Sequence, residues 1–306
     1  MTEGNNQRAA VIGGGTMGAD IAAIFTAASW KVDLVEPASA QWPRTRERVA
    51  RAATQLGGAR TEARLLERLE DVDWCGLTIV IECVPEKLPL KQAVFAQMAS
   101  FADAGTLLAS NSSSFPISDI SRGLQTRDRM LGLHFFMPAH LVPAVEVVRG
   151  EATDPAVCET AARLLRSLGK VPVNVKKDVP GFLANRLQHA LAREAFALID
   201  EGLASAEDID AAVRFGFGLR YLAAGPVLQK DIAGIDIHCA AATTMYPHLA
   251  RDTRPAKVLS DKVASGKLGM KTGEGFYQWT PETAEREKAR YERALLDALE
   301  ILRREG

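Results

Sequence analysis

Short apolar runs alternate with longer, helix-like segments from residue 8 to about residue 178. Strands separated by helix-length segments form βαβ units, whose strands run parallel. Asp154 followed by Pro155 marks one helix start, because the carboxylate caps free N–H groups and proline fits the first helical position. We therefore expect an α/β domain with a mostly parallel sheet. The apolar, β-prone runs cover residues 9–12, 32–35, 77–81, 106–109, 130–133, 145–148 and 171–175.

The pattern changes after the charged, turn-forming segment 176–181. From Phe182 onward the apolar positions recur with helical spacing, and no strand is expected. We therefore divide the chain into an α/β domain, residues 1–178, and an all-helical domain, residues 179–306. The first helix of the second domain carries an apolar stripe at Leu183, Leu187, Ala190, Leu191, Ala195 and Leu198.

Further helices of the second domain have recognisable ends. Ser205 and Asp208 have the spacing of a capping box, which predicts that a helix starts there. Gly216 and Gly218 are expected to end this helix, since glycine commonly follows a helix C-terminus. Three more helices are expected at 232–246, 255–264 and 282–304.

Composition narrows the class of protein. The chain has 306 residues, and 37 Lys and Arg against 38 Asp and Glu give a net charge of −1. Nucleic acid is not expected as a partner, because neutralising phosphates needs an excess of positive charge. No apolar run approaches the roughly 18 residues of a membrane span, so no membrane partner is expected. The polar residues 1–8 and four scattered cysteines without a Cys-x-x-Cys pair predict a cytoplasmic protein.

Glycines follow the first apolar run in the order of a dinucleotide-binding loop. Residues 13–18 read GGGTMG, a G-x-G-x-x-G motif that leads from a strand into a helix. Its first glycine permits the tight turn, the second lets a pyrophosphate approach the backbone, and the third lets the helix pack on the strand. The helix N-terminus supplies N–H donors and a positive dipole end. The residues expected to bind the cofactor here are Gly13, Gly15, Thr16, Met17 and Gly18.

Glu36 ends the second apolar run, about 20 residues beyond the start of this loop. An acid at this place hydrogen-bonds the ribose hydroxyls of the cofactor and repels a 2′-phosphate. The sequence therefore predicts a Rossmann-type domain that binds NAD in preference to NADP.

His134 and Glu146 are candidates for proton transfer. His134 follows the run 130–133, and Glu146 lies inside the apolar run 145–148, where a charge is costly unless it is paired. Neighbouring strands can bring an imidazole and a carboxylate together as a base with its orienting partner. The spacing alone fits a structural histidine and an unrelated solvated glutamate equally well. His140 could join this pair as a metal ligand, but further ligands are missing and no metal is expected.

Seven motifs, in the same order along the chain, resemble those of the L-3-hydroxyacyl-CoA dehydrogenase family over residues 8 to about 280. The resemblance implies an NAD-dependent oxidoreductase that converts a secondary alcohol into a ketone. The motifs are the glycine loop at 13–18, IECVPE at 81–86, SNSSS at 110–114, HFFMP at 134–138, VEV at 145–147, KDVPGFLANR at 177–186 and KTGEGFY at 271–277.

The resemblance also implies roles for individual residues. The histidine of the family's HFF motif is the general base, which implies that role for His134, with Glu146 as its partner. Ser113 and Asn185 match residues that hydrogen-bond the substrate oxygen and support the nicotinamide end. The remaining implied cofactor contacts are Glu86, Lys91 and Lys271.

Two departures from the family pattern concern the cofactor and coenzyme A. Met137 stands where the family has Asn, and a thioether cannot replace an amide that contacts the cofactor. The segment between Glu36 and the run 77–81 is shorter than in acyl-CoA dehydrogenases, where it forms a helical tail that holds coenzyme A. The sequence therefore weakens the expectation of a coenzyme A thioester substrate.

Arg220 is the third departure, a single cation in an otherwise apolar stretch. An unpaired guanidinium in such surroundings is costly, and its planar fork suits a carboxylate. We expect Arg220 to bind a free carboxylate of the substrate. An internal ion pair with Asp231 or Asp208 and a solvent-exposed arginine are the alternatives.

The substrate thus stays open between a small free hydroxy acid and an acyl-CoA thioester. The sequence favours the free acid, as in the branch of the family that contains L-gulonate 3-dehydrogenase (lambda-crystallin) and carnitine dehydrogenase. A non-catalytic dinucleotide-binding protein that retains the fold is a remoter alternative. Helical second domains of this family usually dimerise, which implies a homodimer.

Overall fold

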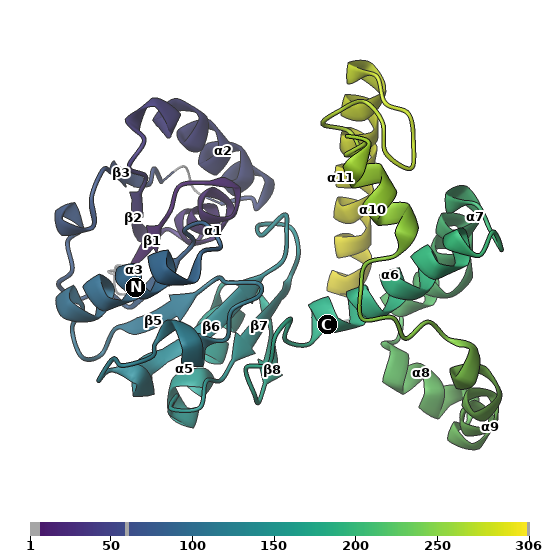
Figure 1. The fold of residues 1–306 in the computed structure, drawn as a ribbon. Coiled ribbons are helices and arrows are strands. Elements are labelled where there is room, and N and C mark those ends of the chain that lie inside the picture. The colour runs from purple at the N-terminus through teal and green to yellow at the C-terminus, as the bar shows by residue number, and fades with distance from the viewer. Residues whose placement is uncertain (1–6, 59–60, 305–306) are drawn as a thin grey trace. The chain divides into compact units, whose positions relative to one another are not determined.

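The computed structural model describes residues 7–58 and 61–304 (Figure 1). The chain divides into two compact units, Met1–Arg186 and Leu187–Gly306. Within the described residues, all strands of the sheet belong to the first unit and the second unit is helical. None of the helices in residues 7–58 and 61–304 combines the length and the apolar character needed to cross a bilayer.

The sheet of the first unit has the strand order β3-β2-β1-β4-β5-β6-β7-β8. All neighbouring strands are parallel except β6 and β7, which are antiparallel. The mostly parallel sheet predicted from the sequence is confirmed, and only β3 was missed, since three residues give no period. The strands are β1 (Arg8–Ile12), β2 (Lys31–Val35), β3 (Arg64–Leu66), β4 (Ile79–Glu82), β5 (Leu107–Ser110), β6 (Met130–Phe135), β7 (Ala144–Val148) and β8 (Val171–Val175).

Helices cover both faces of this sheet. Strand side chains alternate between the faces, so Val11 and Ile81 pack toward α1, α2 and α5, whereas Ile12 and Val80 pack toward α3 and α4. By the same alternation the last side chain of β4, Glu82, lies on the α3 side. The helices are α1 (Thr16–Ala27), α2 (Trp42–Gln55), α3 (Leu88–Phe101), α4 (Ile117–Ile120) and α5 (Pro155–Ser167).

The predicted start of α5 is confirmed. The Asp154 carboxylate accepts a hydrogen bond from the backbone N–H of Ala156 at 2.8 Å, and Pro155 occupies the first helical position. The crevice where ligands bind in such open sheets lies at the carboxyl ends of the strands, where the strand order reverses between β1 and β4. The residues that follow β1, β2, β4 and β5 are therefore placed to meet a cofactor.

The named elements in the described part of the second unit are all helices, as predicted, and two isolated β-bridges join Glu274 to Gly269 and Gln278. Ser205 caps α7 by accepting the N–H of Asp208 at 3.1 Å, which confirms the predicted helix start. The Asp208 carboxylate accepts the Ser205 hydroxyl at 2.7 Å in place of the backbone N–H of a full capping box. A π-helix (Ala212–Phe217) and a 3-10 helix (Gly218–Leu222) continue the chain after α7. The α-helices are α6 (Ala184–Asp200), which begins in the first unit, α7 (Ala206–Ala211), α8 (Pro226–Ala233), α9 (Ile235–Met245), α10 (Lys257–Ala264) and α11 (Pro281–Arg304).

Two predictions for the helices of this unit were wrong. Gly216 and Gly218 do not end a helix, because the helical backbone continues through both. A Cβ on Gly218 would lie 2.5 Å from the carbonyl oxygen of Val213, so this glycine permits tight winding and does not cap the helix. The single helix expected at 232–246 is divided at Gly234, whose φ of 101° a helix cannot accommodate.

Candidate active site

The glycine loop has the shape that a pyrophosphate requires. Gly13 has φ 112°, and a Cβ there would lie 2.7 Å from the carbonyl oxygen of Cys83. A Cβ on Gly18 would lie 1.8 Å from the carbonyl oxygen of Gly13, whereas a Cβ on Gly15 would meet nothing within 4 Å. Gly13 and Gly18 are therefore needed for close backbone packing, and Gly15 leaves open space in front of the loop where a phosphate fits.

Glu36 is fixed beside this loop. Its Oε2 accepts the backbone N–H of Gly14 at 3.1 Å, and its Oε1 accepts the N–H of Ala38 at 2.9 Å. A cavity of about 590 Å³ opens here, lined among others by Gly14, Glu36, Arg44, Arg48 and Arg51. The carboxylate is thus held at the edge of a cavity large enough for a nucleoside, where ribose hydroxyls can bind it.

A buried polar cluster ties the helix of the glycine loop to the segment that follows β6. Asp20, on α1, accepts two hydrogen bonds from Arg48 at 2.7 and 2.9 Å and one from the N–H of Ala139 at 3.3 Å. Its Oδ2 also lies 3.3 Å from Nδ1 of His140, whose Nε2 lies 2.7 Å from the side-chain oxygen of Gln55. Burial would raise the pKa of Asp20, but its hydrogen bonds to His140 and Arg48 outweigh this and lower it.

The two proton-transfer candidates meet across the antiparallel strands. His134 on β6 and Glu146 on β7 are directly opposite each other, and His134 Nδ1 lies 2.7 Å from Glu146 Oε2. Both side chains are buried, at 4% and 1% exposure. The other oxygen of Glu146 accepts the N–H groups of Leu183 and Ala184 at 3.0 and 2.8 Å. The predicted pairing of the imidazole and the carboxylate is present.

Glu146 is held in its charged form. Burial would raise its pKa, but the hydrogen bond to His134 and those from Ala184 and Leu183 lower it below the ordinary value of 4.5. Because an ionised carboxylate only accepts hydrogen bonds, His134 Nδ1 is the donor in this contact. Nε2 makes no hydrogen bond within the described residues.

Two aromatic rings fix the plane of this imidazole. The ring of Phe136 lies 4.8 Å from the ring of His134, edge to face, and the ring of Phe182 lies 5.6 Å away. Phe182 is buried and has a φ of 48°, which is rare for a bulky residue. This turn at Phe182 also directs the next two N–H groups toward Glu146.

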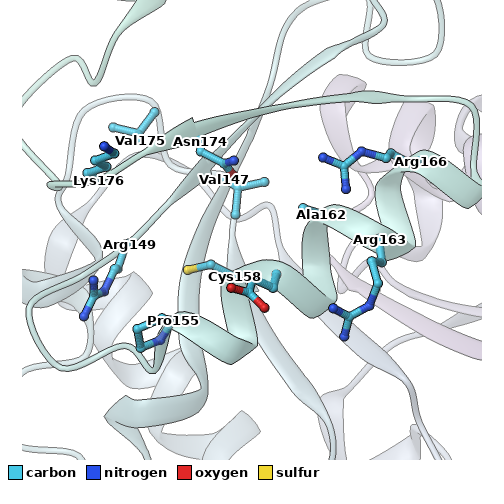
Figure 2. A pocket seen from close by; sticks show the side chains of 11 residues that line it. Val147, Arg149, Pro155, Cys158, Ala162, Arg163, Arg166, Asn174, Val175 and Lys176 are labelled. Carbon is cyan, nitrogen blue, oxygen red and sulfur yellow. The ribbon is translucent and has the colours of Figure 1, made fainter.

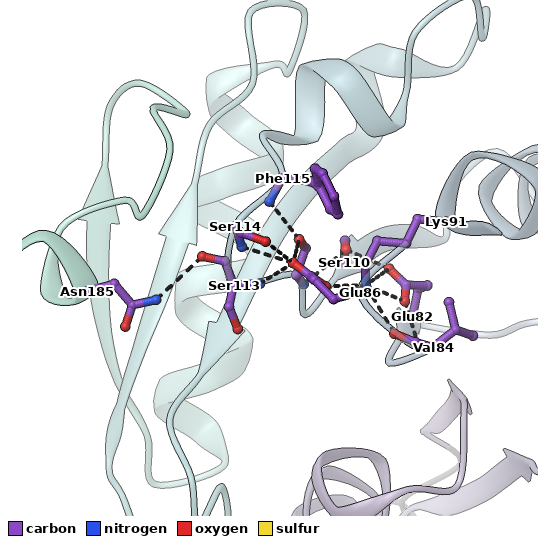
Figure 3. Close-up of polar contacts among 10 residues, drawn as sticks. Glu82, Val84, Glu86, Lys91, Ser110, Ser113, Ser114, Phe115 and Asn185 are labelled. Atoms are coloured by element: carbon purple, nitrogen blue, oxygen red, sulfur yellow. Dashed lines mark hydrogen bonds and ion pairs between the residues drawn. The ribbon is translucent and has the colours of Figure 1, made fainter. Parts of the chain in front are cut away.

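The turn after β5 brings the substrate-binding candidates to the same region. The side-chain amide of Asn185 donates to the carbonyl oxygen of Ser113 at 3.4 Å (Figure 3). The side-chain oxygen of Asn111 accepts the N–H of Phe135, the residue after His134, at 2.9 Å. His134, Glu146, Ser113 and Asn185 are thus linked through short contacts inside the first unit.

Glu86 and Lys91, which were expected to contact the cofactor, contact each other and the protein. Lys91 is 1% exposed, and its Nζ lies 2.9 Å from Glu82, 3.0 Å from Glu86 and 3.2 Å from the carbonyl oxygen of Val84. Its ammonium is therefore surrounded by protein oxygens. Met137, the departure from the family pattern, is 67% exposed.

Sequence reasoning did not single out Glu82, Asn111 and Phe182. Glu82 had a readable signal, because a carboxylate that ends an apolar strand needs a partner, and Lys91 lies on the next helix. Asn111 had a weaker one, as the only amide in the turn after β5. Phe182 had none, since its backbone conformation is not encoded in its residue type.

Two predicted site residues, Arg220 and Lys271, belong to the second unit. Arg220 lies in the 3-10 helix Gly218–Leu222 with its side chain exposed, so no desolvation cost demands a partner for it within this unit. In the part of the chain that the structure describes, it forms no ion pair with Asp208 or Asp231. Lys271 is exposed in a turn.

A separate cavity of about 430 Å³ lies between α5 and the strands β7 and β8 (Figure 2). Four cations line it, Arg149, Arg163, Arg166 and Lys176, and all four are exposed. Arg149 follows the end of β7, and because β7 is antiparallel this is the sheet edge away from the carboxyl ends of the parallel strands. We regard this cavity as a solvated cationic surface and assign it no role in the site.

The chain matches two family profiles that follow each other along the sequence. Its residues 8–179 match the profile of the 3-hydroxyacyl-CoA dehydrogenase NAD-binding domain, and residues 181–279 match that of the C-terminal domain. The chain belongs to the 3-hydroxyacyl-CoA dehydrogenase family. It is an NAD-dependent oxidoreductase that acts on CH–OH groups, which agrees with the glycine loop and the position of Glu36.

Individual family members differ in their substrates. The chain is 35% identical over 301 residues to 5-formyl-3-hydroxy-2-methylpyridine 4-carboxylate 5-dehydrogenase of Mesorhizobium japonicum, covering 96% of this chain and 97% of that one. It is 36% identical to L-carnitine dehydrogenase of Streptomyces griseus, covering 74% of this chain and 70% of that one.

Two solved structures of relatives show the same difference in substrates. A crystal structure of the formyl-hydroxymethylpyridine carboxylate dehydrogenase, described as an NAD⁺-dependent dismutase, matches with a TM-score of 0.92 and 34% identity over 97% of this chain and 99% of that one. The 3-hydroxybutyryl-CoA dehydrogenase of Escherichia coli K12 matches with a TM-score of 0.72 and 33% identity, over 90% of this chain and 60% of that chain.

Proposed function

We propose that this family member oxidises the hydroxyl-bearing carbon of a small, free hydroxy acid, with His134 as the general base. The observation that carries the proposal is the 2.7 Å contact between His134 Nδ1 and Glu146 Oε2, which leaves Nε2 free to accept a proton. His134 Nε2 takes the proton of the substrate hydroxyl while the carbon–hydrogen bond breaks and the carbonyl forms. Bound NAD⁺ supplies the hydride acceptor.

The neighbouring residues assist this transfer. Glu146 stabilises the imidazolium that forms on His134, because its charge and its hydrogen bond favour the protonated ring. The hydroxyl of Ser113 donates to the substrate oxygen as negative charge develops there. Asn185, bonded to the carbonyl of Ser113, holds this turn and the start of α6 together at the site.

Two observations favour a small free acid over a coenzyme A thioester. Between Glu36 and Ile79 the described residues form one α-helix, α2, one short strand and short 3-10 turns, and no longer helical tail. The relatives with similar sequences include a pyridine carboxylate dehydrogenase and a carnitine dehydrogenase. The structure of the former has a TM-score of 0.92, against 0.72 for the 3-hydroxybutyryl-CoA dehydrogenase. The thioester substrate remains the second candidate.

A substrate panel tests the proposal directly. NAD⁺ reduction is measured with L-carnitine, L-gulonate, 3-hydroxybutyrate and 3-hydroxybutyryl-CoA. It is measured separately with 5-formyl-3-hydroxy-2-methylpyridine 4-carboxylate, in which the hydrated formyl carbon and not the ring carbon would donate the hydride. We expect the highest kcat/KM for a free acid. The highest kcat/KM for the thioester would establish the second candidate in its place.

Arg220 is proposed to bind the carboxylate of this substrate. Losing one charge-assisted contact typically costs about 1.5–3 kcal/mol, or roughly 10- to 150-fold. We therefore expect Arg220→Ala to raise KM for the preferred hydroxy acid by about this factor, and to leave KM for its methyl ester unchanged. The matched variant Arg214→Ala, also an exposed arginine of the second unit, serves as the control. Equal losses on acid and ester would show that Arg220 does not read the carboxylate.

We further propose that the protein is a homodimer formed through its helical unit. Among the described residues of this unit only Gly275 and Ala284 are buried, whereas many large apolar side chains are exposed, and such a surface normally meets a partner. We expect sedimentation velocity to give twice the chain mass. A monomer at micromolar concentration would contradict this. The most exposed of these side chains are Val227, Phe215, Ile232, Leu203 and Val263.

A further inference from the structure

Ser112, Ser113 and Ser114 follow β5, and only two of their hydroxyls donate to the Glu86 carboxylate. Glu86 Oε1 accepts the hydroxyls of Ser112 and Ser114 at 2.6 and 2.7 Å (Figure 3). The same oxygen accepts the backbone N–H groups of Ser113 and Ser114 at 3.1 and 3.0 Å. Within the described residues the hydroxyl of Ser113 makes no hydrogen bond. Glu86 thus binds the two outer hydroxyls and leaves the middle one available.

Both oxygens of Glu86 are occupied by the protein. Oε2 lies 3.0 Å from Nζ of Lys91, and Oε1 takes the serine donors. Burial would raise the pKa of Glu86, but the hydrogen bonds from Ser112, Ser114 and Lys91 lower it to about 2. Glu86 is therefore ionised at any pH where the enzyme works, and little of its hydrogen-bonding capacity is left for another molecule.

A second carboxylate, that of Glu82, also binds Lys91. Glu82 is fully buried at the end of β4 and accepts Lys91 Nζ at 2.9 Å and the Ser110 hydroxyl at 2.6 Å. Lys91 is thus fixed between two carboxylates. The buried charges make the position of Glu86 rigid, because moving it would leave Lys91 without one of its partners.

The serine turn is attached to the catalytic pair at two places. Asn111 accepts the N–H of Phe135, next to His134 on β6, and Asn185 donates to the carbonyl of Ser113. Any change in the turn therefore changes where the Ser113 hydroxyl lies relative to the imidazole.

We propose that Glu86 is a positioning residue that fixes the turn of Ser112–Ser114 so that only the Ser113 hydroxyl is free for the substrate oxygen. This assignment rests on the proposed function, in which Ser113 donates to that oxygen. The resemblance implies that Glu86 contacts the cofactor directly, and the positioning role takes the place of that contact. Lys91, which holds Glu86, has the same positioning role. A displacement of about 1 Å at a reacting group can cost about 100-fold in rate.

A double-mutant cycle tests it. Glu86→Gln keeps the side chain's size and removes its charge, Ser113→Ala removes the free hydroxyl, and the double variant combines them. We expect Glu86→Gln to slow single-turnover NADH formation by about 10- to 100-fold. In the Ser113→Ala background the same change should have an effect of less than about threefold, because a residue that acts through Ser113 has nothing left to position. The dissociation constant of NADH, from fluorescence titration, should stay within about threefold of wild type throughout.

Asp71→Asn is the matched control. It also removes an ion-paired carboxylate of lowered pKa from the first unit, but the partner of Asp71 is Arg68 and not the serine turn. Should Glu86→Gln not fold, Ser114→Ala removes one of the four donors to Glu86 Oε1, the Ser114 hydroxyl. It is expected to show a smaller rate loss that is again absent without Ser113.

Three results overturn the proposal. A tenfold weaker binding of NADH to Glu86→Gln would restore the direct cofactor contact. Multiplicative rate losses in the double variant would show that Glu86 acts independently of Ser113, and a wild-type rate in Glu86→Gln would show that it does not act. If the wild-type protein oxidises no substrate of the panel, the proposed function is overturned. The NADH titration needs no substrate, so it still tests whether Glu86 contacts the cofactor.

Discussion

His134→Ala is expected to lose about 10²- to 10⁴-fold in kcat and to bind NADH as wild type does, because the imidazole acts on the substrate proton. His134 Nε2 is the acceptor that the contact with Glu146 leaves free. Steady-state rates with the preferred substrate and a fluorescence titration with NADH give the two quantities. A turnover near wild type would remove His134 as the base.

Glu146→Gln refines this experiment. Its carboxylate is ionised and orients the His134 ring, so the amide should lower kcat by less than loss of the imidazole does. Because the folded pKa of Glu146 lies below its unfolded value of 4.5, the pair stabilises the fold above that pH and loses its contribution as the pH falls through the folded pKa. Loss of NADH binding in either variant, with a lowered melting temperature, would indicate damage to the fold and not to the chemistry.

Glu36→Ser is expected to shift the kcat/KM preference from NAD⁺ toward NADP⁺ by about 10- to 150-fold. The change removes the negative charge and frees the N–H groups of Gly14 and Ala38, which now bind the Glu36 carboxylate. Arg44 and Arg51 line the same cavity and can pair with a 2′-phosphate. Rates with both cofactors, at saturating substrate, measure the shift.

Glu47→Gln provides the comparison for this variant. Glu47 lines the same cavity, so its loss changes the charge there equally but frees neither N–H group. We expect a clearly smaller change in cofactor preference. If both variants shift the preference equally, the net charge of the cavity and not the position of Glu36 sets the choice of cofactor.

The sequence predicted those parts of the molecule in which residue type and spacing determine the structure. Short apolar runs separated by helix-length segments located every strand of the sheet except β3. The rule that a buried charge needs a partner pointed to the pair His134–Glu146. The helix start at Ser205 was readable because its geometry depends on a side chain. The division of roles among such residues came from resemblance.

The rest was unreadable because it depends on backbone direction and on which of several identical groups is occupied. The N–H groups of Leu183 and Ala184 that bind Glu146 belong to any residue type. Ser112, Ser113 and Ser114 are the same residue type, and only the hydroxyls of Ser112 and Ser114 donate to Glu86. The glycines at 216 and 218 resembled helix ends, because a glycine needed for close packing and one needed for positive φ look the same.

The buried cluster around Asp20 has a consequence for how the first unit responds to its cofactor. Asp20 is on the helix that begins at the glycine loop, and it is bonded to the N–H of Ala139, five residues after His134 along the chain. Ordering of that helix by a dinucleotide is therefore transmitted to the segment behind the base without crossing solvent. We expect the amide hydrogens at residues 139–142, in the segment that follows β6, to exchange more slowly once the phosphate loop is filled and before any substrate binds.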